Sequence, residues 1–174
     1  PDMKHIPGVD MSTGSLGQGI SAAVGMALSS KHFGDGYNVY AILGDGEIEE
    51  GQVWEAAMFA ANKGLSNLTA FIDLNNLQID GTIDEVNSAK PVDKKFEAFG
   101  WHVINIDGHN YAEIEAALAE AKTVDKPVAV IAQTIKGKGV SYMENAVNWH
   151  GAAPNDELYA VAMQELTAAL AALN

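Results

Sequence analysis

The stretch that decides the fold is Val39-Tyr40-Ala41-Ile42-Leu43-Gly44-Asp45-Gly46, an apolar run that ends in a glycine–aspartate–glycine turn. A second apolar run, 68–72, is followed closely by Asn75-Asn76. Short apolar runs bounded by turn residues are typical of buried strands, and the segment 52–63 between the two runs has a helical pattern. Strand, helix and strand form a βαβ unit, in which ligands bind at the carboxyl ends of the strands.

We therefore expect Asp45 and Asn75 to face one crevice at the carboxyl edge of the sheet. Carboxylate and amide oxygens suit hard cations such as Mg²⁺ or Ca²⁺. Taken singly, each motif is also ordinary turn chemistry, because Asp-Gly and Asn-Asn are common in loops. Their pairing across one helix favours a metal site over two unrelated turns.

The rest of the chain continues the alternation of strands and helices. Small and apolar residues at helical spacing predict a helix over 15–31, capped by Ser12, Thr13 or Ser15. Further predicted helices cover 93–99, 111–121 and 156–173, and further strands cover 101–106 and 128–132. Residues 1–14 are predicted to form an extended lead-in, and 133–154 a long active-site loop. This order predicts a single α/β domain over 1–174, with a three-layer, doubly wound, mostly parallel sheet.

Composition narrows the function. The 174 residues are 48% hydrophobic and 7% aromatic, so we expect a core built mainly from Ala, Val, Ile, Leu and Met. The net charge of −13 argues against partners such as nucleic acid or anionic membranes. No apolar run reaches the ~18 residues of a membrane-spanning helix. The absence of cysteine excludes thiol catalysis and fits a cytoplasmic location.

Three common motifs are excluded by their context. Gly17-Gln18-Gly19-Ile20-Ser21-Ala22 approaches a dinucleotide fingerprint, but no strand precedes it. The glycines of 46–51 have the spacing of a P-loop, but Gln52 stands in place of its lysine. The histidines lack the spacing of a zinc hydrolase. A diphosphate anchored through a metal ion remains, since the chain has few cations of its own.

Four segments together resemble the diphosphate-binding domain of transketolase. In chain order they are Pro7-Gly8-Val9-Asp10-Met11-Ser12-Thr13-Gly14-Ser15-Leu16-Gly17-Gln18-Gly19; Gly44 to Gly51 with Phe71 to Gly81; Thr134-Ile135-Lys136-Gly137-Lys138-Gly139; and His150-Gly151-Ala152. The resemblance covers 7–154 and implies a thiamine diphosphate-binding fold.

The resemblance also implies a set of metal ligands. Mg²⁺, with Ca²⁺ or Mn²⁺ as substitutes, would be held by the side chains of Asp45 and Asn75 and by the backbone carbonyl of Leu77. Aligning Ile79-Asp80-Gly81 with the family places the ligand on Asn75 rather than Asn76. Leu74 then takes the first position of the usual asparagine pair.

The same resemblance implies cofactor contacts and catalytic residues. His150 would lie near the diphosphate and the reacting centre, with loop histidine as the alternative interpretation. Glu50, and with it Glu55, would face the dimer contact and link two active sites, with helix capping and surface charge as the alternative. The implied cofactor-binding residues are Gly14, Ser15 (proline in the family), Leu16, Asp45, Gly46, Glu47, Asn75, Ile79 and His150.

A transketolase site also needs a pyrimidine domain, which this sequence lacks. The chain therefore resembles the N-terminal subunit of a split transketolase without its front portion, acting with a pyrimidine-domain partner in a homodimer or heterotetramer. The implied reaction moves a two-carbon ketol unit from a ketose phosphate to an aldose phosphate, as in the pentose phosphate pathway. The alternatives are 1-deoxyxylulose-5-phosphate synthase, the α subunit of a 2-oxo acid dehydrogenase, a non-catalytic assembly module and a minimal fragment of the fold.

Overall fold

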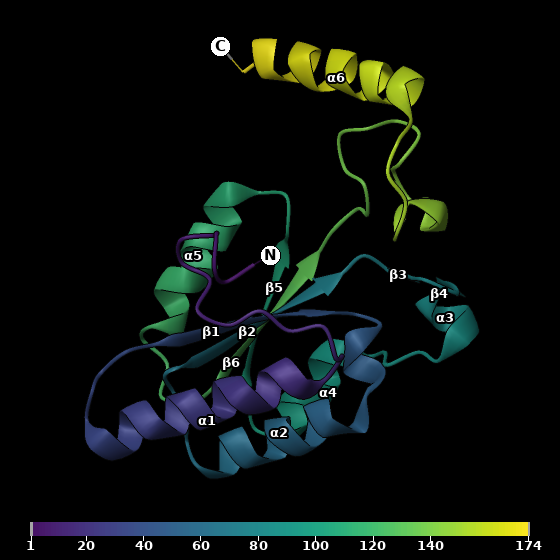
Figure 1. The fold of residues 1–174 in the computed structure, drawn as a ribbon. Coiled ribbons are helices and arrows are strands. Elements are labelled where there is room, and N and C mark those ends of the chain that lie inside the picture. Colours follow the sequence, from purple (N-terminus) through teal and green to yellow (C-terminus); the bar gives the residue numbers. More distant parts are fainter. Residues whose placement is uncertain (1, 174) are drawn as a thin grey trace.

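The centre of the fold is a four-stranded, all-parallel sheet with the strand order β1-β2-β6-β5 (Figure 1). The structure is a computed structural model and describes residues 2–173. The sheet strands are β1 (Val39–Gly44), β2 (Leu68–Leu74), β5 (His102–Asp107) and β6 (Val128–Gln133). The α-helices are α1 (Gln18–Phe33), α2 (Gly51–Asn62), α3 (Ile83–Val86), α4 (Val92–Ala98), α5 (Tyr111–Ala121) and α6 (Asp156–Ala171). The predicted α/β fold with a doubly wound parallel sheet is thus confirmed.

The register of the strands brings the loops after β1 and β2 together. Gly44 lies opposite Asp73, and the Asp45 N–H donates to the Asp73 carbonyl at 3.1 Å. A short 3₁₀ helix, η1 (Glu47–Glu49), leads from β1 into α2. The two loops therefore start from adjacent strand ends, as the βαβ pattern predicts.

Helices cover the two faces of the sheet unequally. α1, α2 and α4 pack on one face and enclose the larger apolar core, while α5 covers the other face over β5 and β6 (Figure 1). On the α5 face of β1, Tyr40 is 47% exposed and Ile42 is 81% exposed. Buried parallel sheets normally have both faces covered. The described part of the chain thus leaves the β1 corner of this sheet open to solvent.

The larger core contains an aromatic cluster that composition did not predict. Phe96 of α4 packs against Trp54 of α2 and against Trp101, with ring centroids 5.2 and 5.4 Å apart. Trp101 is buried before β5 begins, and its indole N–H donates to the Ala57 carbonyl at 2.9 Å. Alanine, valine, isoleucine and leucine fill the rest of the core as expected, whereas no methionine among the described residues is buried.

The first predicted helix starts later than expected and has a different cap. α1 begins at Gln18 behind Gly17, which is left-handed (φ 80°) and makes no side-chain cap bond. The prediction that Ser12, Thr13 or Ser15 caps this helix is wrong. The reason is spatial: a Cβ on Gly17 would lie 2.9 Å from the Glu50 Cβ, so the chain turns here against η1 and α2.

Two predicted irregular segments contain more local structure than expected. Residues 3–8 form turns, with the Ile6 N–H donating to the Asp2 carbonyl at 2.9 Å, so 1–14 is not extended throughout. Residue 1 lies outside the described residues. A two-stranded hairpin, β3 (Leu77–Gln78) and β4 (Gly81–Thr82), follows Asn76, and a 3₁₀ turn, η2 (Val147–Trp149), lies within 133–154. Short paired segments of this kind have too few residues to show a period.

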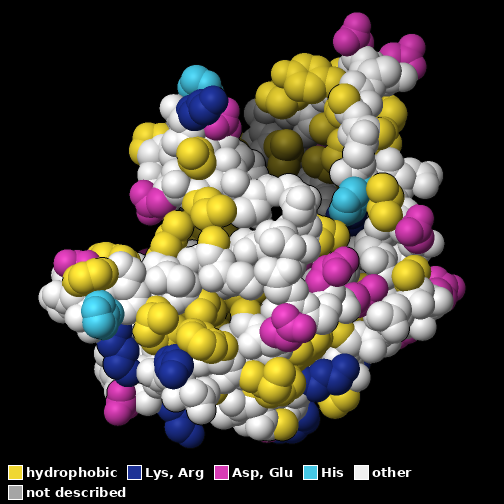
Figure 2. Space-filling view, turned by 60° about the horizontal axis from the view of Figure 1, so that its bottom comes forward, with side chains coloured by type: hydrophobic (Ala, Val, Ile, Leu, Met, Phe, Trp, Pro, Cys, Tyr) yellow, Lys and Arg dark blue, Asp and Glu magenta, His cyan; other side chains and the backbone are white. Residues whose placement is uncertain are grey.

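The C-terminal helix α6 stands apart from the sheet and its flanking helices (Figure 1). Its Asn155 cap is confirmed, because the Asn155 side chain accepts from the Leu158 N–H at 2.9 Å. Tyr142 of the preceding loop donates its hydroxyl to the Leu158 carbonyl at 2.9 Å. Figure 2 shows hydrophobic side chains beside a hollow near this part of the molecule. Among residues 2–173, no helix has the length and apolarity needed to cross a membrane.

Candidate functional site

Asp45 is the central side chain at the carboxyl edge of the sheet. It is only 2% exposed, although it carries a carboxyl group. One carboxyl oxygen accepts from the Gly46 N–H at 2.9 Å, and the other accepts from the Asn76 N–H. The hydrogen bond to Asn76 joins the loop after β1 to the loop after β2. The structure therefore brings together the two motifs that the sequence paired.

The electrostatics of Asp45 fit a bound cation. Burial raises the pKa of Asp45 above its ordinary value of 3.8, the Asp73 carboxylate acts in the same direction, and the backbone donors oppose both. Among residues 2–173, no Lys, Arg or His forms an ion pair with Asp45. Buried charges are normally paired or bound to a metal. A hard divalent cation would supply the missing positive charge.

Asn75 and Leu77 flank Asn76 in sequence, the residue whose N–H donates to this carboxylate. Asn75 forms a turn in which its side-chain oxygen accepts from the Leu77 N–H at 3.0 Å. Asn76 is left-handed (φ 65°), a conformation that Asn adopts more easily than most residues. Asn76 thus acts through its backbone N–H, which agrees with the register that assigns the ligand role to Asn75. The role itself stays a prediction.

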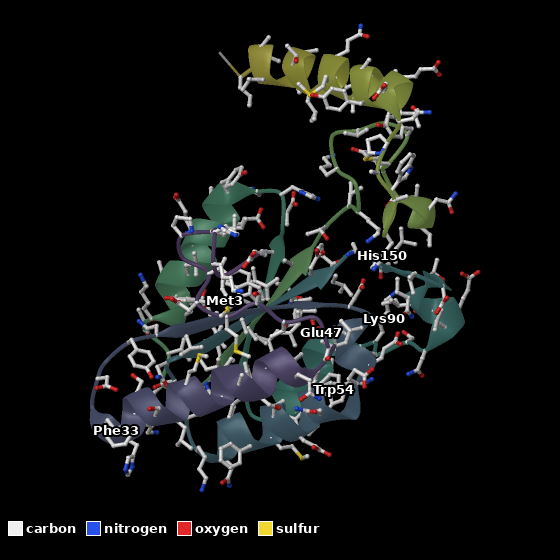
Figure 3. The ribbon with its side chains drawn as sticks, in the orientation of Figure 1. Met3, Phe33, Glu47, Trp54, Lys90 and His150 are labelled. Atoms are coloured by element: carbon white, nitrogen blue, oxygen red, sulfur yellow. The ribbon has the colours of Figure 1, made fainter. Side chains whose placement is uncertain are left out.

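Glu47 ties the start of α1 to the same edge of the sheet. Its two carboxyl oxygens accept from the Gly17 N–H at 3.1 Å and from the Gly44 N–H at 3.2 Å. Figure 3 shows Glu47 at the junction of the lead-in with η1. The predicted contact segment 14–16 is thereby held beside the loop after β1. Glu47 has a structural task here, and a contact with the cofactor stays a prediction.

The position of Gly46 requires glycine because of close packing rather than because of its backbone conformation. Its φ of −68° is open to any residue, but an added Cβ would lie 3.0 Å from the Gln78 Oε1 and 3.1 Å from the Gln78 Cβ. Gln78 is held in turn by a 3.1 Å hydrogen bond from its Nε2 to Glu49. A side chain at this position would therefore displace Gln78, and glycine lets the loop after β1 approach the β3–β4 hairpin closely.

We expect Gly46→Ala to weaken diphosphate binding by ~10-fold, because the methyl group would press on Gln78 and shift the backbone that is proposed to receive the phosphate. Gly51→Ala is the matched control, since a Cβ at Gly51 meets no atom within 4 Å. Calorimetric titration of thiamine diphosphate with Mg²⁺ would compare the two variants. Equal affinities for both would contradict the placement of the diphosphate.

The remaining predicted residues surround this centre at its exposed edges. Leu16 is 58% exposed and Ile79 is 64% exposed, and Gly14 and Ser15 are exposed as well. His150 follows η2 and is exposed; Figure 3 shows it beyond the carboxyl end of the sheet, on the side of the β3–β4 hairpin. Within the described residues its side chain has no hydrogen-bond partner. These groups are available to a ligand, and their roles stay predictions.

Glu50 and Glu55 are exposed on the outer side of η1 and α2. Helices α1 and α2 carry exposed hydrophobic side chains, among them Met26, Met58 and Phe59, which are 37–50% exposed. Figure 2 shows hydrophobic and acidic side chains together on one face of the molecule. Neither glutamate belongs to the carboxylate centre at Asp45. Their position agrees with the predicted contact to a second chain, which no interaction within residues 2–173 tests.

Asp73 and Thr134 were missed by sequence reasoning. The Thr134 hydroxyl donates to the Asp73 carboxylate, and that carboxylate also accepts from the Asn75 amide nitrogen at 3.2 Å. The signal that could have found them is their place: Asp73 lies near the end of β2, and Thr134 directly follows β6. Both therefore lie at the same edge as Asp45.

Comparison with known families matches residues 1–168 to the family described as "Transketolase, thiamine diphosphate binding domain". The 6-deoxy-6-sulfo-D-fructose transketolase subunit SqwG of Clostridium sp. (strain MSTE9) is 49% identical over 166 residues, which are 95% of this chain and 60% of that protein. An apulose-4-phosphate transketolase subunit of Phocaeicola vulgatus is 41% identical over 94% of this chain and 58% of its own length. The chain thus spans about 60% of the length of these curated relatives.

Solved transketolase structures have the same fold as this chain. The crystal structure of transketolase from Campylobacter jejuni superposes with a TM-score of 0.86 at 35% sequence identity. The alignment covers 92% of this chain and 26% of that one.

Proposed function

This chain belongs to the family of transketolase thiamine diphosphate-binding domains, and from that premise we propose that it binds Mg²⁺ and thiamine diphosphate as one half of a transketolase active site. The observation that carries the proposal is the buried Asp45 carboxylate, which lacks a cationic partner among residues 2–173 and lies against the Asn75-Asn76 turn. Asp45, Asn75 and the Leu77 carbonyl would hold the cation. Gly46 and the segment 14–16 would receive the cofactor's diphosphate and rings.

When bound, thiamine diphosphate supplies the nucleophilic carbon and the electron sink of ketol transfer. The protein's part is to fix and shield the site. Asp45 would hold the cation that neutralises the diphosphate, and the backbone N–H groups near Gly46 would add donors. His150, exposed on a loop with no partner among the described side chains, would move a proton or stabilise charge at the reacting end.

The complete reaction needs a second chain. We propose that a pyrimidine-domain subunit docks on the exposed surface of α1 and α2, which carries hydrophobic side chains and, at the start of α2, Glu50 and Glu55. Two relatives carry the word subunit in their names, which supports a divided enzyme. Homodimeric or heterotetrameric assembly, the cytoplasmic location and a role in the pentose phosphate pathway stay predictions.

We expect ketol transfer from a ketose donor only when this chain and a transketolase pyrimidine-domain partner are combined with Mg²⁺ and thiamine diphosphate. His150→Ala in this mixture should lower kcat by ~100-fold, the usual size of a lost acid–base group. Donors should include a phosphorylated ketose and a sulfonated ketose, because the Clostridium and Phocaeicola relatives are assigned to sugars of different chemistry.

The controls separate this function from its rivals. His109→Ala removes another exposed histidine, one that anchors the Ile135 N–H at 2.8 Å, and should preserve kcat better than His150→Ala does. Turnover of pyruvate in place of a ketose would contradict the proposal and favour a different thiamine diphosphate enzyme. Binding without turnover of any donor, with a competent partner present, would favour a non-catalytic module.

A further inference from the structure

The side-chain amide of Asn75 is held at both of its ends. Its oxygen accepts from the Leu77 N–H at 3.0 Å, and its nitrogen donates to an Asp73 carboxyl oxygen at 3.2 Å. An amide oxygen has two lone pairs, of which the Leu77 N–H uses one. A rotated amide would place its NH₂ group against the Leu77 N–H and its oxygen against the Asp73 carboxylate. Asp73 therefore selects the orientation in which the Asn75 oxygen keeps a lone pair for a cation.

Asp73 is itself held from a different strand. The hydroxyl of Thr134, directly after β6, donates to the same Asp73 oxygen that accepts from Asn75. The backbone fixes Thr134 in place, since its N–H donates to the Leu74 carbonyl at 3.3 Å. The bonds thus run from β6 through Thr134 and Asp73 to the amide of Asn75.

The space for Thr134 depends on a glycine after β5. A Cβ on Gly108 would lie 2.5 Å from the Thr134 Cγ2 and 3.1 Å from the Ala132 Cβ, distances too short for a side chain. The Gly108 N–H donates to the Gln133 carbonyl at 2.8 Å and keeps this approach close. The ends of β5, β6 and β2 therefore together determine the position of the Thr134 hydroxyl beside Asp73.

We propose that Asp73, held by Thr134, is a positioning residue that orients the Asn75 amide oxygen toward the divalent cation. The proposal rests on the proposed function, because it assumes that Asn75 is a ligand. Partners that orient metal ligands commonly set metal affinity although they do not touch the metal. Thr134 is the residue to test, since its substitution leaves the charge of the site unchanged.

The experiment measures Mn²⁺ binding by electron paramagnetic resonance, with thiamine diphosphate present, in the wild-type chain and in three variants. Thr134→Val removes the hydroxyl and keeps the shape, and should weaken Mn²⁺ binding by ~10-fold. Thr134→Ser restores the hydroxyl and should restore the affinity. Thr123→Val is the matched control, because that hydroxyl donates to the Glu120 carbonyl at the end of α5, away from the site.

A second measurement reports the amide directly and does not need a metal. In ¹⁵N-labelled chain without metal, the Asn75 NH₂ protons should exchange slowly with water, and Thr134→Val should speed this exchange while Thr123→Val does not. Unchanged Mn²⁺ affinity in Thr134→Val, with wild-type binding intact, would overturn the proposal. Wild-type chain that binds no Mn²⁺ would refute the metal site instead, and fast Asn75 exchange in the wild type would overturn the positioning role in either case.

Discussion

Asp45→Ala is expected to abolish Mg²⁺-dependent binding of thiamine diphosphate. The variant removes the buried carboxylate at the joined loops, so the affinity should fall by more than ~100-fold, beyond the 10–100-fold typical of losses outside the ligand set. It also leaves the Gly46 and Asn76 N–H groups without their acceptor, which should cost about 1–3 kcal/mol of stability. Calorimetry gives the affinity, and chemical denaturation gives the stability.

The chain offers a matched control for this variant. Gly34-Asp35-Gly36 repeats the same three residue types just before β1, at the opposite end of the strand. Asp35 is exposed, so Asp35→Ala should leave cofactor binding unchanged. Equal loss in both variants would show that general destabilisation, rather than a lost ligand, accounts for the effect at Asp45.

The raised pKa of Asp45 adds a pH dependence to the same experiment. The carboxyl group of Asp45 has a pKa near 3.8 in the unfolded chain and a higher pKa in the folded chain. Without a cation, the folded chain therefore loses stability as the pH rises from 3.8 through this higher pKa, because the buried group becomes charged. Mg²⁺ should therefore raise the melting temperature at neutral pH and lose this effect as the pH falls and Asp45 becomes protonated. In Asp45→Ala, Mg²⁺ should leave the melting temperature unchanged at neutral pH and at acidic pH.

Phe96→Ala is expected to cause the largest loss of stability, about 3–5 kcal/mol, as is usual for a buried phenylalanine. Phe96 is 2% exposed and joins Trp54, Phe99 and Trp101 in the aromatic cluster between α2 and α4. This cluster contains none of the predicted ligands. Below the unfolding transition, the variant should therefore bind thiamine diphosphate and Mg²⁺ with wild-type affinity.

Phe33→Ala controls for the loss of a phenyl ring. Phe33 is 74% exposed at the end of α1 and contacts the ring of His32 only at its edge, so its loss should change stability by less than about 0.5 kcal/mol. Figure 3 shows Phe33 at the far end of α1 from Glu47. A loss in Phe96→Ala as small as that in Phe33→Ala, measured by urea unfolding, would contradict the described core.

The regular parts of the fold could be predicted because their signal is local. The runs that form β1, β2 and β6 are apolar on both faces, which is typical of strands in a parallel sheet and holds even for the edge strand β1. Trp101 shows where this reasoning stops. The sequence pattern predicts that it belongs to a strand with 102–106, but its ring turns into the core and donates to the Ala57 carbonyl, a partner 44 residues away. Composition also could not show that a few aromatic residues gather in one place.

The candidate site could be predicted to the extent that it consists of strand ends. Asp45 and Asn75 each follow an apolar run, and the parallel register brings those ends together. Asp73 and Thr134 were out of reach, because their hydrogen bond depends on β6 lying next to β2, a pairing of strands 61 residues apart at these positions. The prediction of the α1 cap was wrong for a similar reason. The position of Gly17 is set by its contact with Glu50 rather than by the residues next to it in sequence.

We expect this chain alone to form the metal and diphosphate half of a transketolase site. The deciding measurement is calorimetric titration of thiamine diphosphate into the wild-type chain with Mg²⁺, into the wild-type chain with EDTA, and into Asp45→Ala with Mg²⁺. We predict binding with Mg²⁺ that disappears with EDTA and in the variant. Binding of equal strength in all three titrations, or no binding in any of them, would contradict this expectation.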